Sequence, residues 1–335
     1  MRMPVSSETS AELAVDLSDV RKVYRGEVEA LRSISMDARR GEVFGLLGPN
    51  GAGKSTLVKI MLTVVRATRA NGTILGAPVG DKSVLSKVGY LPEKHRFPEY
   101  LTGRQAVEFS GAMCNVARTV RRRRAAELLD LVGMTDWADR KVSTYSKGMM
   151  QRIGIAAAMV NDPELVVLDE PTDGVDPIGR RDIRDVLIRI REQGVCVFLN
   201  SHLLSELEMV CDRVAILIQG KVATQGTIDE LTAESRRYKV VFRGAPPAWC
   251  EEDGLRVDAS GEGRSTLIAP QVEVEGLQPI IDRLRRENIE IVSVEPIRES
   301  LEDLFMRYVR DPLTGRAVMP GALRKNPPVG SGGNP

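Results

Sequence analysis

A glycine-rich run between two regular segments has the residue types that bind phosphate. Its residues are Gly48, Pro49, Asn50, Gly51, Ala52, Gly53, Lys54, Ser55 and Thr56. The run follows the apolar segment 43–47 and precedes a helical pattern over 55–65. Glycines let successive backbone N–H groups turn toward one anion, and the start of a helix adds partial positive charge there. The pattern GxxxxGK[ST] in this setting predicts a loop that holds the phosphates of a nucleotide.

Two side chains of this loop have separate expected tasks. Lys54 is expected to reach the β- and γ-phosphates as a point charge, where it also assists catalysis. Ser55 is expected to place its hydroxyl on a bound Mg²⁺. The competing interpretation is a glycine-rich turn that binds nothing, and the complete pattern in its strand-to-helix setting disfavours it.

A second group of reactive residues ends the apolar run Leu165 to Leu168. Asp169 and Glu170 follow it directly, and burying an unpaired charge at the end of a buried strand is costly. Given the phosphate loop upstream, we expect Asp169 to bind Mg²⁺ and Glu170 to act as the general base on an attacking water. The alternative is a solvated strand end.

Composition limits the class of protein. The chain has 335 residues, a formal net charge of +1 and 42% hydrophobic residues, which indicates a folded chain of two domains. The near-zero charge and the 4% of aromatic residues give no reason to expect a nucleic-acid partner. No apolar stretch approaches the roughly 18–20 residues that span a bilayer. The polar N-terminus and four scattered cysteines fit an intracellular, reducing compartment.

The order of apolar segments predicts the elements that must position these residues. Short apolar strands alternate with helical patterns up to about residue 218, which is typical of a parallel sheet covered on both faces. The segment from 95 to 160 reads as helical, with breaks at Gly103, Gly133 and 141–146. The fold class is therefore α/β.

The pattern changes near residue 235 to that of a small α+β unit. Segments 238–242 and 265–268 are predicted as exposed edge strands, and Ser300 as the N-cap of a last helix. The predicted divisions are a disordered lead, a nucleotide-binding domain, an accessory C-terminal α+β domain and a disordered tail. Their bounds are 1–11, 12–235, 236–311 and 312–335.

Over about residues 13 to 230, the sequence resembles the nucleotide-binding subunit of ATP-binding cassette (ABC) transporters. Residues 145–152 stand where that family has its signature motif, just before the acidic strand. Residues 174–177 are similar to the family's D-loop, and Ser201 with His202 closes a later strand as the family's switch histidine does. The resemblance implies a P-loop NTPase cassette with a parallel core sheet, a β-rich N-terminal subdomain and a helical subdomain.

The resemblance also assigns roles to residues outside the phosphate loop. Tyr24 stands at about the distance of the family's adenine-stacking aromatic, with a core or interface tyrosine as the alternative. In the family two cassettes pair head to tail, so Ser146 and Gly148 would complete the partner's nucleotide site. His202 would hydrogen-bond the γ-phosphate as a catalytic residue. The implied cofactors are ATP and Mg²⁺.

The chain departs from the family's usual pattern in two places. Glu93 stands where a glutamine is usual, and its carboxylate could also bind Mg²⁺. The signature reads YSKGM, so Lys147 adds a cation at the start of its helix. That position is unfavourable for the helix dipole and favourable for a nucleotide.

Residues 200–208, 211–213 and 300–305 resemble the ATPases of bacterial ABC-2-type exporters. The resemblance implies a homodimer beneath separate membrane permease subunits, cytoplasmic and peripheral on the inner face of the cell membrane, that drives export. The alternative function is a soluble non-transport ABC ATPase, associated with regulation, translation or repair. A third hypothesis, compatible with either, makes the C-terminal unit a sensing or dimerising switch.

Two further features have no assigned chemistry. The arginine run 121–124 reads as a solvated helix face, with contact to the membrane partner or anionic headgroups as the alternative. His95 has no expected partner and is interpreted as incidental.

Overall fold

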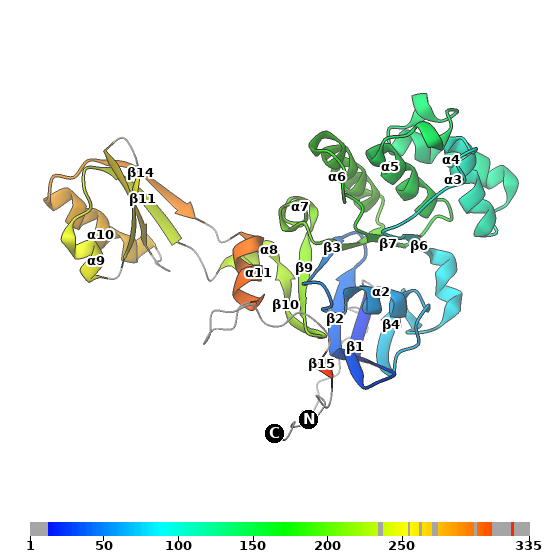
Figure 1. Cartoon of the computed structure of the whole chain (residues 1–335), viewed down its shortest axis with the longest axis horizontal. Helices are drawn as coiled ribbons and strands as arrows, with labels where there is room; N and C mark the ends of the chain where they lie inside the picture. The colour runs from blue at the N-terminus through cyan, green and yellow to red at the C-terminus, as the bar shows by residue number, and fades with distance from the viewer. Residues whose placement is uncertain are drawn as a thin grey trace, which may run out of the picture. The chain divides into compact units, whose positions relative to one another are not determined.

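A computed structural model describes residues 13–233, 237–253, 255–260, 263–269, 274–297, 300–309 and 323–324. The chain divides into two compact units (Figure 1). The first comprises residues 1–226 together with 308–335, and the second comprises residues 227–307. The predicted lead 1–11 lies outside the described residues.

The first unit is built on a six-stranded sheet in the order β10-β9-β3-β8-β7-β6. Its strands are β3 (Val43–Leu47), β6 (Val88–Leu91), β7 (Leu165–Asp169), β8 (Cys196–Asn200), β9 (Arg213–Ile218) and β10 (Lys221–Thr227). The pairs β9–β3, β3–β8, β8–β7 and β7–β6 are parallel. All five residues of β3 and of β8 are buried, as expected for strands covered on both faces. The predicted α/β class with a parallel core sheet is confirmed.

This strand order decides where the chemistry is placed. β3 and β7 are the two neighbours of β8, so the carboxyl ends of these three strands lie side by side. The phosphate loop follows β3, Glu170 follows β7, and His202 lies two residues after β8. Open parallel sheets bind ligands at this edge.

A second sheet in the first unit is antiparallel, and it confirms the β-rich N-terminal segment. It has the order β15-β2-β1-β4-β5. Its strands are β1 (Leu13–Tyr24), β2 (Val28–Arg39), β4 (Arg69–Ile74), β5 (Ala77–Pro78) and β15 (Leu323–Arg324). β15 pairs with Val28 and Glu29 of β2. The tail 312–335, predicted to be disordered, therefore contains a short strand, and its other residues lie outside the described part.

The helices of the first unit cover the parallel sheet and form a separate helical region. They are α2 (Lys54–Met61), α3 (Gly103–Met113), α4 (Arg118–Leu131), α5 (Lys147–Ala158), α6 (Pro177–Glu192) and α7 (Leu204–Val210), with 3₁₀ turns at Lys82–Lys87, Thr135–Trp137 and Val142–Thr144. Figure 1 shows α3, α4 and α5 gathered away from β1, β2 and β4. α3 begins at the predicted break Gly103, because Thr102 accepts a hydrogen bond from the backbone of Gln105 in a capping box.

The second unit is a small α+β domain with a sheet in the order β12-β13-β11-β14. Its elements are α8 (Ile228–Ala233), β11 (Arg237–Arg243), α9 (Ala248–Glu252), β12 (Arg256–Ser260), β13 (Arg264–Ala269), α10 (Val274–Arg286), β14 (Ile291–Ile297) and α11 (Leu301–Val309), the last of which continues two residues past the unit boundary. Oγ of Ser300 accepts a hydrogen bond from the backbone N–H of Asp303, as the predicted cap requires.

The prediction of two exposed edge strands in this unit is wrong. β11 and β13 are interior strands, and the edges are β12 and β14. Val240, Phe242 and Leu267 of these interior strands belong to one buried cluster with Leu277 and Leu284 of α10. Alternation in the sequence reports one buried face of a strand, but it does not report how many strands pair with it.

Candidate active site

The phosphate loop has a backbone shape that only glycine allows at two positions. Gly53 has φ +112°, and a Cβ there would lie 2.7 Å from the carbonyl oxygen of Ala30. A Cβ on Gly48 would lie 2.3 Å from the carbonyl oxygen of Leu217. Gly53 is also the N-cap of α2 and supplies no side-chain cap. The first backbone N–H groups of α2 are therefore left for an anion, as the sequence predicts.

Lys54 is a buried cation held by the loop itself. Its side chain donates to the carbonyl oxygens of Gly48 and Pro49 at 2.5 and 3.4 Å, and the residue is 8% exposed. Burial lowers its pKa, while the negative charges of Glu170 and Asp169 act in the opposite direction. Within the described part of the chain, no ion pair joins Lys54 to a carboxylate. A buried ammonium without a paired anion fits a phosphate ligand.

Tyr24 lies beside the phosphate loop. Its hydroxyl is 3.4 Å from Oγ1 of Thr56, and the Nζ of Lys22 lies 4.9 Å from the centre of its ring. A cavity of about 290 Å³ is lined by Tyr24, Val28, Ala30 and residues 50–56. The structure thus brings the predicted aromatic residue to the predicted loop, 32 residues away in sequence.

Asp169 ends β7 and is partly buried. Its Oδ1 accepts a hydrogen bond from Nδ2 of Asn200, the last residue of the neighbouring strand β8. Burial raises the pKa of Asp169, the hydrogen bond from Asn200 lowers it, and the negative charge of Glu93 raises it further. Ionising this carboxylate is therefore costly in the free protein, and a cation bound beside it would offset that cost.

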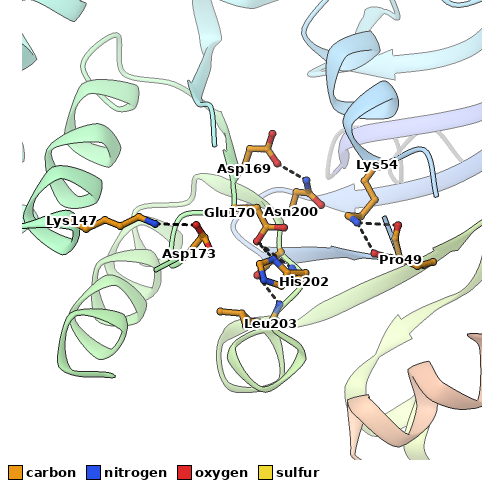
Figure 2. A network of polar contacts seen from close by, with 11 residues as sticks. Pro49, Lys54, Lys147, Asp169, Glu170, Asp173, Asn200, His202 and Leu203 are labelled. Atoms are coloured by element: carbon orange, nitrogen blue, oxygen red, sulfur yellow. Dashed lines mark hydrogen bonds and ion pairs between the residues drawn. The ribbon is translucent and has the colours of Figure 1, made fainter. Parts of the chain in front are cut away.

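Glu170 and His202 form a close pair at the end of the sheet. Nδ1 of His202 lies 2.7 Å from Oε2 of Glu170, and the backbone N–H of His202 lies 3.3 Å from the same oxygen. Glu170 has φ +52°, an uncommon conformation for a residue with a side chain. Its backbone N–H donates to the carbonyl oxygen of Asn200 at 2.8 Å, which fixes this turn. In the view of Figure 2 the pair lies between the Lys54 loop and Lys147.

The residues predicted to bind Mg²⁺ do not form a complete metal site by themselves. No group of three or more His, Cys, Asp or Glu side chains among the described residues is arranged to hold a metal ion. Glu93 acts on Asp169 through its charge, and both raise the pKa of Tyr90 beyond the effect of burial. Asp169 and the hydroxyl of Ser55 are oxygen donors that suit Mg²⁺, which takes its remaining ligands from phosphates and water.

The signature segment begins α5. Oγ of Ser146 accepts a hydrogen bond from the backbone N–H of Met149 at 3.2 Å, so Ser146 is the N-cap of this helix. A Cβ on Gly148 would lie 3.2 Å from Cγ1 of Val175, at the loop before α6. Every residue that lines the cavity beside the phosphate loop lies between Tyr24 and Thr56. The start of α5 is therefore not part of that cavity.

Sequence reasoning missed three contacts of this region. Nζ of Lys147 lies 3.0 Å from Oδ2 of Asp173, and Asn200 supports Asp169. His95, interpreted as incidental, lies 3.2 Å through Nε2 from the carbonyl oxygen of Met150 in α5. The loop after β6 thus brings His95 against the signature helix, a contact that the sequence does not predict. The opposite charges of Lys147 and Asp173 indicate a possible ion pair, but the sequence does not give the distance between the two side chains.

The four arginines at 121–124 make hydrogen bonds and ion pairs with other residues of the same chain. Arg121 donates to the carbonyl oxygen of Val116, and Arg122, Arg123 and Arg124 form ion pairs with carboxylates. Those carboxylates belong to Glu108, Glu127 and Asp162.

In the part of the chain that the structure describes, every helix is too short or too polar to cross a membrane.

Comparisons with known proteins agree with this geometry. Residues 31–173 match the protein family described as ABC transporter. An uncharacterised ABC transporter ATP-binding protein of Synechocystis is 38% identical, over 92% of this chain and 89% of that protein. The daunorubicin resistance ATP-binding protein of Streptomyces coeruleorubidus is 33% identical, over 90% of this chain and 97% of that protein. The solved structure of cbiO1 from Clostridium perfringens, part of an ABC transporter complex, has a TM-score of 0.61 and 26% identity, and it covers 67% of this chain and 92% of that one.

A parallel sheet with a phosphate loop, a paired glutamate and histidine and a capped signature helix defines a P-loop ATPase cassette. The chain belongs to the family of ABC transporter ATP-binding proteins. It binds ATP, and its hydrolysis of ATP is coupled to transport with a membrane permease partner. The alternative of a non-transport ABC ATPase is not favoured by these relatives.

Proposed function

We propose that two copies of this chain bind two Mg²⁺·ATP head to tail and drive export through separate ABC-2-type permease subunits. The observation that supports it most is the arrangement at the end of the parallel sheet. The buried Lys54, which forms no ion pair with any described carboxylate, and the Glu170–His202 pair follow neighbouring strands of the sheet. This arrangement offers a cation for the transferred phosphoryl group and a carboxylate for the attacking water.

Each residue has a task in that mechanism. The backbone of residues 50–53 and Lys54 would hold the phosphates, and Tyr24 would stack on the adenine. Glu170 would orient and deprotonate the water, with His202 fixing the carboxylate through its 2.7 Å contact. Bound Mg²⁺, on Ser55 and Asp169 with Glu93 nearby, would neutralise charge on the β- and γ-phosphates.

The proposed pairing accounts for the position of the signature helix. Ser146 and Gly148 stand at the start of α5, outside the cavity that contains the phosphate loop. In a head-to-tail pair the same helix start would face the nucleotide of the other copy. One chain would then supply half of each of two sites, and hydrolysis would require association.

The proposed direction of transport rests on relatives that are named for drug resistance. These include the daunorubicin resistance protein above and a linearmycin resistance ATP-binding protein of Bacillus subtilis that is 37% identical over 64% of this chain. Export through a permease would place the chain on the inner face of the cell membrane as a peripheral subunit. This placement, like the second copy, is part of the proposal.

The test is to isolate the tagged chain from gently solubilised membranes of its own cell and identify what accompanies it. A polytopic membrane protein in about equal amount supports the proposal, and its deletion should release the chain from the membrane fraction. Recovery of the chain with ribosomes or nucleic acid, or alone, would contradict the exporter assignment and leave the ATPase intact.

A further inference from the structure

Lys147 is held in an ion pair that joins the signature helix to the loop after Glu170. Its Nζ lies 3.0 Å from Oδ2 of Asp173, and the two side chains are 53% and 50% exposed. Lys147 is the first residue of α5, directly after the cap Ser146. Figure 2 shows its extended side chain reaching Asp173 across the space between the two segments.

The loop has room for this side chain because position 174 lacks one. A Cβ on Gly174 would lie 2.2 Å from Nζ of Lys147 and 3.1 Å from its Cε. The ammonium and the end of its stem thus lie directly over the backbone of Gly174. Gly174 has φ +62°, so the turn itself favours glycine. The pair is therefore set in a turn that accommodates it rather than being a chance meeting of two long side chains.

The ion pair meets an electrostatic need of the free chain. A cation at the first position of a helix faces the positive end of the helix dipole, which is unfavourable. Asp173 compensates this charge, and the hydrogen bond from Lys147 holds the pKa of Asp173 below its ordinary value. The charges of His202 and Arg180 act on Asp173 in the same direction. These smaller effects would offset part of the negative charge of Asp173 if Lys147 moved away.

We propose that the Lys147–Asp173 pair is a latch on nucleotide-driven association of two copies. Without a partner, Asp173 holds the ammonium of Lys147 within its own chain. When a second copy presents its nucleotide to the start of α5, Lys147 leaves Asp173 and pairs with the γ-phosphate. This inference rests on the proposed head-to-tail dimer.

Moving the ammonium from Asp173 to a phosphate is electrostatically favourable, and breaking the existing ion pair costs little free energy. A terminal phosphate carries more negative charge than one carboxylate, and in a closed interface its attraction for an ammonium is less screened by water. The existing pair is half exposed, and exposed ion pairs hold weakly because water and salt screen them. Asp173 thus competes with the phosphate for one cation, and removing either member of the pair should have opposite effects on association.

The test compares variants in a Glu170→Gln background, where ATP is bound but not consumed. The fraction of dimer is measured by light scattering over a range of Mg²⁺·ATP concentrations. Asp173→Asn should free Lys147 and lower the ATP concentration for half-maximal association by about threefold. Lys147→Gln should raise that concentration by about tenfold. An equal shift in one direction for both variants, or no shift for either, would overturn the latch.

A charge exchange provides the control for a merely structural pair. Lys147→Glu combined with Asp173→Lys restores an ion pair at the same place but presents a carboxylate to the phosphate. A structural role predicts that this double variant associates like the parent, whereas the latch predicts that association is lost while thermal unfolding resembles the parent. If the double variant does not fold, the opposite shifts of the two single variants decide the question. If the Glu170→Gln parent itself stays monomeric with ATP, the proposed dimer fails, which is a separate result from a failed latch.

Discussion

Nδ1 of His202 lies 2.7 Å from Oε2 of Glu170, although the two residues follow different strands. The contact exists because β7 and β8 are parallel neighbours whose carboxyl ends meet. The side chain of Glu170 is 13% exposed and that of His202 is 52% exposed, so the imidazole is the more accessible member of the pair. If Glu170 is the general base, as we propose, this contact would fix the direction of its carboxylate.

Replacing His202 by alanine should lower the turnover number of ATP hydrolysis by about 100-fold, because the carboxylate of Glu170 loses its positioning contact. Affinity for ATP should change little, since Lys54 and the loop backbone hold the phosphates. Steady-state hydrolysis and equilibrium binding of a fluorescent ATP analogue separate the two effects. Ser205→Ala, an exposed change on α7, serves as the control and should hydrolyse ATP at the parental rate. Parental turnover in His202→Ala would remove the histidine from the mechanism.

Replacing Lys54 by alanine should weaken ATP binding by roughly 10- to 100-fold, the effect of losing a charge-assisted contact. The matched control is Lys59→Ala, which removes the same charge from an exposed position of the same helix. Calorimetric titration of both variants with Mg²⁺·ATP makes the comparison. Equal affinities would show that net charge on α2, and not the position of Lys54, matters for binding.

Asp169→Asn should stabilise the nucleotide-free protein near neutral pH while abolishing Mg²⁺-dependent hydrolysis. The pKa of Asp169 is raised by burial, so its ionised form is disfavoured in the folded state. The neutral amide removes that cost, and the midpoint of thermal unfolding should rise by roughly 2 °C.

The advantage of Asp169→Asn should shrink as the pH falls. A group with a raised pKa adds stability below its unfolded value and loses it as the pH rises through the folded value. On acidification the parent therefore takes up a proton at Asp169 and recovers stability that the variant already has. Unfolding scans near pH 7.5 and about pH 5 measure this, with the exposed Asp185→Asn as control. A constant difference between parent and variant across this range would contradict the burial of the charge.

A chain that ends at residue 235 should fold and bind ATP, because the first compact unit contains both sheets that form the nucleotide site. The loss of β15 removes only a two-residue edge pairing with β2. Circular dichroism and ATP titration of the truncated chain test this. An unfolded product would show that the predicted domain boundary is wrong.

The phosphate loop could be predicted because its information is contiguous. Strand, glycines, lysine and helix follow one another along the chain, so the motif can be recognised without knowing the fold. The contacts that complete the site are not local: Lys147 and Asp173 are 26 residues apart, and His202 and Glu170 are 32 apart. Their meeting depends on the order of strands in the sheet, which residue types do not encode. The same limit explains why the sequence wrongly predicts β11 and β13 to be edge strands, since a strand's pattern of burial does not state its number of neighbours.

The proposed dimeric ATPase is best tested with Glu170→Gln, which keeps the shape of the side chain and removes the proposed base. Turnover and molar mass by light scattering are measured with and without Mg²⁺·ATP. We expect hydrolysis reduced by about 100-fold or more, undiminished ATP binding, and a stable species of twice the mass of one chain only when ATP is present. Hydrolysis at the parental rate, or a mass that ATP does not change, would contradict it.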